Sequence, residues 1–72
     1  MIRADKNHVF RMYSIFLKDA AVADELGFYE KADSAYWMAA TYADELGFEA
    51  PESVLCRAKK EQRRIDEKRA AA

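Results

Sequence analysis

The hexapeptide ADELGF occurs twice in this chain, at residues 23–28 and 43–48, and each copy contains one of the only two glycines. Gly27 and Gly47 can adopt the left-handed backbone conformation that ends a helix, and the phenylalanine after each can fold back onto the last turn. Pro51 suits the first turn of a further helix, because the amide that proline lacks would have had no partner there. We therefore expect three helices, at about residues 6–26, 29–46 and 51–68, followed by a frayed tail at 69–72.

The first of these helices carries more apolar residues than one neighbouring helix can cover. They are spread over most of its circumference: Val9, Phe10, Met12, Tyr13, Ile15, Phe16, Leu17, Ala20, Ala21 and Ala23. Only four residues define a clearly polar side: Arg11, Ser14, Lys18 and Glu25. The surplus must be covered either by the third helix or by another chain.

The second helix has a stripe of alternating tyrosine and alanine. Its apolar positions recur at intervals of three and four residues: Tyr29, Ala32, Tyr36, Ala39, Ala43 and Leu46. This spacing places them on one side of a helix and predicts close packing against the first helix, with the rings beside the alanines. The fold class that follows is all-α, an antiparallel helical hairpin with a third, basic helix.

Trp37 lies off that stripe, on the same side as Asp33, Thr41 and Asp44. This side is expected to meet water. Two interpretations stay open for the indole: it is exposed or covered by the third helix, or it is an aromatic anchor for a partner, a role in which tryptophan is over-represented.

The chain is long enough for one domain, residues 1–72, and its core is marginal because a chain of this size buries only about 60% of its unfolded surface. Half of the residues are hydrophobic (51%), so a small helical domain like this often completes its core with a second copy or another protein. We therefore expect a homo-oligomer. A single cysteine, Cys56, and the lack of an apolar run for a signal peptide or membrane span predict a cytoplasmic protein.

Charge is distributed in blocks along the chain. Residues 1–18 carry a net +3, residues 19–50 a net −7 and residues 51–72 a net +3. We expect the acidic and basic blocks to neutralise each other, within the fold or between copies. A nucleic-acid interface is the alternative, because three basic residues along one side of the third helix could follow a phosphate backbone: Arg57, Lys60 and Arg64.

No catalytic or metal-binding constellation is evident, so we expect a protein that is not an enzyme and has no cofactor. His8 is the only histidine and is expected to be an ordinary surface residue, while Cys56 has no histidine near it and is expected to be partly buried. Asp24 and Glu25, in a last helical turn, have no basic residue near them in the sequence and are expected to be solvated.

The run GFYEKADSAYWMA fits the pattern G-x-Y-x-x-A-x-x-x-aromatic-x-x-A, through Gly27, Tyr29, Ala32, Tyr36 and Ala39. It resembles the corner and second helix of a tetratricopeptide repeat. It is also similar to the small ANR family, negative regulators of AraC-type transcription activators in enteric bacteria, and the length of the chain favours this family. The resemblance covers about residues 13–46, and Trp37 stands one position after the family's usual tryptophan.

The ANR resemblance implies a short regulator that binds an activator protein and blocks its dimerisation or DNA binding. The residues expected to contact such a partner are aromatic or aliphatic: Tyr13, Phe16, Leu17, Trp37 and Met38. Besides the nucleic-acid binder, a third possibility is a phage or plasmid accessory protein that inhibits another host machine.

Overall fold

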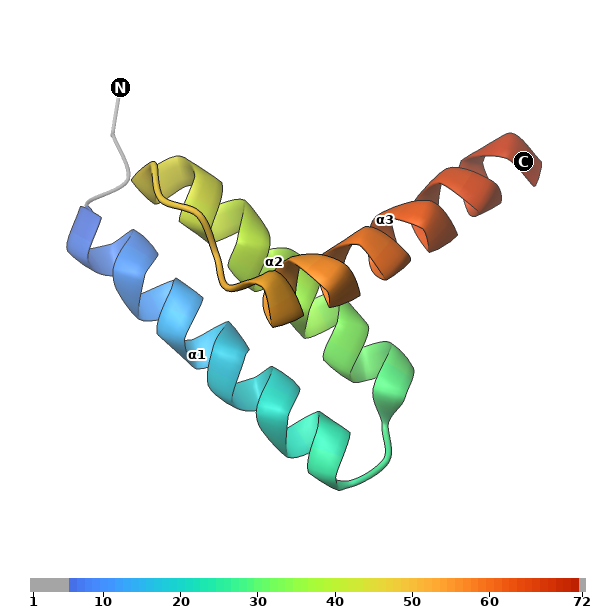
Figure 1. The fold of residues 1–72 in the computed structure, drawn as a ribbon, viewed down its shortest axis with the longest axis horizontal. Coiled ribbons are helices and arrows are strands. Elements are labelled where there is room, and N and C mark those ends of the chain that lie inside the picture. Colours follow the sequence, from blue (N-terminus) through green and yellow to red (C-terminus); the bar gives the residue numbers. More distant parts are fainter. Residues whose placement is uncertain (1–5, 72) are drawn as a thin grey trace.

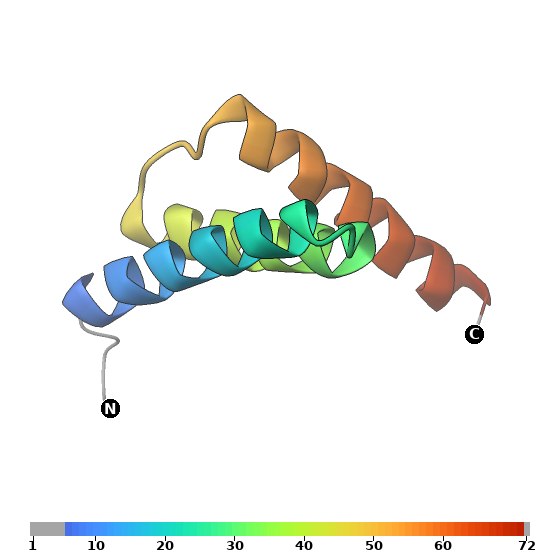
Figure 2. The same cartoon turned by 90° about the horizontal axis from the view of Figure 1, so that it is seen from below.

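The computed structural model describes residues 6–71 and consists of three helices, α1 (Lys6–Glu25), α2 (Tyr29–Leu46) and α3 (Glu52–Ala71) (Figure 1). α1 and α2 run antiparallel side by side, and α3 crosses α2 and projects beyond the hairpin (Figure 2). The predicted all-α hairpin with a third basic helix is confirmed. The predicted fraying from residue 69 is wrong as far as Ala71, because alanine favours helix and Lys68 and Arg69 suit the helix C-terminus.

Both copies of the hexapeptide end a helix in the same way, as predicted. Gly27 and Gly47 have φ angles of 82° and 81°, in the left-handed region that glycine adopts without strain. The amide of Phe28 donates to the carbonyl of Ala23 over 2.9 Å, and residues 48 and 43 repeat this bond over 3.1 Å. These bonds are those of a Schellman motif, which satisfies carbonyls that the helix leaves free.

Alanines form the tightly packed part of the hairpin, and the rings lie beside them. Three alanines of α1 and α2 are 0% exposed: Ala20, Ala32 and Ala39. Tyr13 is buried, with its ring edge-on to Phe48 at 5.1 Å. Tyr29 departs from the prediction, since it is 64% exposed: it opens α2 at the corner, where α1 has already ended.

α3 packs chiefly against α2 and leaves much of α1 uncovered. Val54 and Ala58 are its buried residues, as the narrow apolar stripe of this helix allows. On α1, by contrast, Phe10, Ile15 and Val22 are all more than two-fifths exposed. The sequence left two possibilities for covering the surplus apolar residues of α1, the third helix or another chain. The third helix does not cover them.

Candidate functional site

Among residues 6–71, Asp33 is the buried charged residue, and it lies under α3. Its side chain accepts hydrogen bonds from the Nε of Arg57 and, over 3.0 Å, from the Nη2 of Arg64. Only 4% of the residue is exposed. The prediction that this side of α2 meets water holds for Thr41 and Asp44, which are exposed. It is wrong for Asp33, because α3 brings two guanidinium groups that replace the water around its carboxylate.

Arg57 joins all three helices. Its Nη1 and Nη2 donate to the two carboxylate oxygens of Asp24, over 2.9 and 2.7 Å, at the end of α1. Its guanidinium also lies over the ring of Tyr36, 5.1 Å from the centroid, while the Tyr36 hydroxyl donates to Asp24 over 3.3 Å. Asp24 is therefore not the solvated carboxylate that the sequence predicted, since its basic partner lies 33 residues away.

These contacts shift four pKa values, and that of Arg64 is raised by its hydrogen bond to Asp33. The hydrogen bonds from Arg57 hold the pKa of Asp24 below its usual range, although burial opposes that shift. Hydrogen bonds to Asp24 and then to Asp33 raise the pKa of Arg57. Burial, reinforced by the negative charge of Asp24, raises the pKa of Tyr36 and keeps its hydroxyl protonated as a donor.

The lowered pKa of Asp24 predicts a stability loss in acid. A carboxyl group whose folded pKa lies below its unfolded value stabilises the fold above that unfolded value, about 4, and ceases to do so as the pH falls through the folded pKa. We expect the urea midpoint of the native chain to exceed that of an Arg57→Gln variant at pH 7, and the gap to narrow below pH ~4. Urea titrations of both proteins across this range measure it, and a gap of constant size would contradict the assignment.

Two further hydrogen bonds extend the contact between α2 and α3. The indole Nε1 of Trp37 donates to the Oε1 of Gln62 over 2.8 Å, and the hydroxyl of Ser34 donates to the Oε2 of Glu61 over 2.6 Å. Trp37 is half-buried beside α3. Of the interpretations that the sequence left open, the structure therefore favours an indole partly covered by the third helix.

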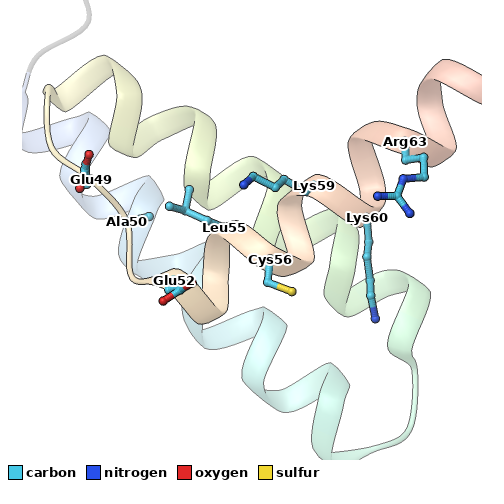
Figure 3. A pocket seen from close by; sticks show the side chains of 8 residues that line it. All are labelled: Glu49, Ala50, Glu52, Leu55, Cys56, Lys59, Lys60 and Arg63. Carbon is cyan, nitrogen blue, oxygen red and sulfur yellow. The ribbon is translucent and has the colours of Figure 1, made fainter.

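The basic residues proposed for nucleic-acid binding do not form one free surface. Arg57 and Arg64 both hold carboxylates, and of the three residues only Lys60 is exposed and has no ion pair with a residue of the range 6–71. Lys59 and Lys60 border a hollow of about 590 Å³ beside α3, but their side chains point in different directions (Figure 3). Cys56, in the same hollow, is exposed and not partly buried as predicted, because it faces away from α2.

A second hollow lies between α1 and α2, and we call it the hairpin groove. Its apolar lining is Phe16 and Ala23 from α1 with Ala35 and Met38 from α2. The groove has a volume of about 330 Å³, and its polar lining residues are Asp19, Lys31 and Ser34. The ring of Phe16 is held in place by stacking on Tyr42 at 5.8 Å.

The five residues predicted to contact a partner are therefore distributed over different sites. Phe16 and Met38 meet in the hairpin groove, whereas Trp37 lies against α3. Leu17 is half-buried against the core. Tyr13 is 8% exposed beneath Phe48, so its assignment to a partner surface is corrected: it belongs to the core.

Sequence reasoning missed the other residues of the groove, although a signal was present. Ala35 and Met38 are three residues apart and lie beside the alanine and tyrosine stripe of α2, which identifies a second, adjacent apolar side. The sequence does not show which side of α1 this second stripe approaches. Without that information, Asp19 and Lys31 could not be assigned to the same groove.

Among residues 6–71, no group of three or more histidine, cysteine, aspartate or glutamate side chains is placed to hold a metal ion. In the same part of the chain, no helix has the length and hydrophobicity needed to cross a membrane. No family model, curated protein or solved structure matches the chain. The resemblances to the ANR family and to the tetratricopeptide hairpin therefore stay predictions.

Proposed function

We propose that this chain is a small, non-enzymatic regulator that binds a helix of a partner protein in the hairpin groove. The observation that carries the proposal is the groove itself: Phe16 and Met38 face an open apolar hollow on a hairpin whose third helix packs elsewhere. An amphipathic helix can place its apolar side chains in a groove of this kind.

The charges at the groove define the chemistry of that helix. Asp19 comes from α1 and Lys31 from α2, so the lining presents one acidic and one basic group. A partner helix with a basic residue toward α1 and an acidic residue toward α2 would complement both, and the pairing would fix its orientation.

The ANR resemblance suggests which protein supplies the helix. We take the partner to be an AraC-type transcription activator, which the chain would inhibit by blocking dimerisation or DNA binding in the cytoplasm. An inhibitor of another host machine, encoded by a phage or plasmid, would use the same groove on a different partner.

The test uses purified AraC-type activators bound to fluorescently labelled operator DNA. Adding the native chain is expected to release the DNA, and the Met38→Glu variant is expected to need at least about tenfold more protein, because it places a charge in the apolar groove. The matched control is Cys56→Glu, which adds the same charge on the exposed side of α3 and is expected to release DNA like the native chain. Circular dichroism of both variants checks that they fold.

Equal effects of the two variants would contradict binding in the groove, and failure to release DNA from any activator would contradict this choice of partner. Retardation of DNA by the chain alone would support the nucleic-acid alternative. Basic residues of α3 that have no ion pair with another described residue are available for such binding, among them Lys59, Lys60 and Arg63. This binding would weaken steeply as salt rises.

A further inference from the structure

The outward side of α1 carries an apolar stripe that no part of the described range 6–71 covers. Ile15, Val22 and the corner residue Leu26 follow one another at intervals of seven and four residues, so they line up along one side of the helix. They are 43%, 49% and 64% exposed. Two of the groove residues of α1, Phe16 and Ala23, lie on a neighbouring side, and the third, Asp19, lies four residues after Ile15, where the two surfaces meet.

Two charged residues border this stripe along one edge. Lys18 precedes Val22 by four residues and Glu25 follows it by three, and both are exposed. Seven residues of helix separate their Cα atoms by about 10.5 Å, which is too far for an ion pair between them. Neither has an ion pair with any other residue of the described range 6–71.

We propose that the occupant of this surface is a second copy of the chain, whose α1 packs antiparallel against the first with the two Val22 residues near the twofold axis. In that arrangement Lys18 of each copy lies beside Glu25 of the other, so two symmetric ion pairs border the interface. Leu26 of each copy lies within one turn of Ile15 of the other. A twofold interface requires a surface that complements itself in this way.

This proposal does not depend on an activator, and its surface meets the hairpin groove only at Asp19. A parallel twofold arrangement would put the charged edges of the two copies on opposite sides of the interface, so Lys18 would not meet Glu25. Pairing of these two charges therefore requires the antiparallel arrangement.

Sedimentation equilibrium of the whole chain and of two charge variants tests the pairing. The native chain is expected to dimerise, and Lys18→Glu and Glu25→Lys are each expected to weaken the dimer by about tenfold or more, because two ion pairs become two like-charge contacts. An equimolar mixture of the two variants is expected to recover native affinity, since every contact in the mixed dimer again joins opposite charges. Lys68→Glu, at the exposed far end of α3, is the matched control and should dimerise like the native chain.

A second variant tests the apolar part of the surface. Val22→Glu is expected to give a monomer with native circular dichroism, because the residue is half exposed and its replacement buries no charge in the monomer. The proposal would be overturned if the native chain stayed monomeric at all protein concentrations used in the sedimentation experiment. It would also be overturned if the mixture of the Lys18→Glu and Glu25→Lys variants dimerised no better than either variant alone.

Discussion

Replacing Asp33 with alanine is expected to lower the free energy of unfolding by about 3 kcal/mol, because it leaves two partly buried guanidinium groups without their shared carboxylate. Arg57 keeps Asp24 and Arg64 keeps Glu61, which places the expected loss at the low end of that known for broken buried ion pairs. A loss of this size is a large fraction of the stability of a small domain.

Urea denaturation measures this loss, and Asp44→Ala is its matched control. Asp44 is an exposed aspartate of the same helix, so its replacement should cost much less. The fluorescence of Trp37, the only tryptophan, reports on the same contact, and its emission should shift to longer wavelength as the indole loses its cover. Equal stability of the two variants would show that α3 is not held by Asp33.

Replacing Tyr13 with alanine is expected to lower the free energy of unfolding by about 3–4 kcal/mol, the loss typical of removing a buried aromatic side chain. Its ring packs edge-on against Phe48 and lies in one cluster with Ala39, Ala43 and Val54. This cluster joins α1, α2 and α3, so the cavity would weaken the packing of all three helices.

Tyr29→Ala is the matched control, since it makes the same chemical change at a residue that is 64% exposed. We expect a stability change within about 0.5 kcal/mol for it, as is usual on a surface. Thermal unfolding followed by circular dichroism separates the two outcomes. If the Tyr13 and Tyr29 variants had the same melting temperature, the ring of Tyr13 would not be part of the core.

The fold was largely predictable because its signals are local. Gly27 ends α1 and Gly47 ends α2. The spacing from Ala32 to Ala43 alone defines the packed side of α2. Each of these features depends on residues within a few turns of one another. These features could therefore be predicted from the local sequence alone, and the structure confirms them.

The position of α3 was not predictable in the same way, because it depends on distant residues. Asp33 pairs with guanidiniums 24 and 31 residues away, and a polar side of a helix normally faces water. The charge blocks predicted that acids and bases neutralise each other within the fold or between copies, and Arg57 and Arg64 do so within the fold. They did not indicate that α3 would lie on Asp33 and leave Val22 exposed.

Both proposals depend on this placement of α3. Because the third helix lies on the polar side of α2, Phe16 and Met38 still line an open groove, and the outward side of α1 stays exposed. Had α3 covered the apolar surplus of α1, neither surface would be available.

The most direct test is a nuclear Overhauser measurement on the indole Nε1 proton of Trp37 in the native chain. The structure predicts cross-peaks from this proton to side chains of α3. The strongest is expected to Gln62, followed by Leu55 or Ala58, which line one hollow together with Trp37. An indole proton with cross-peaks only within α2, combined with cross-peaks between α3 and Ile15 or Val22, would contradict the docking of α3 on α2.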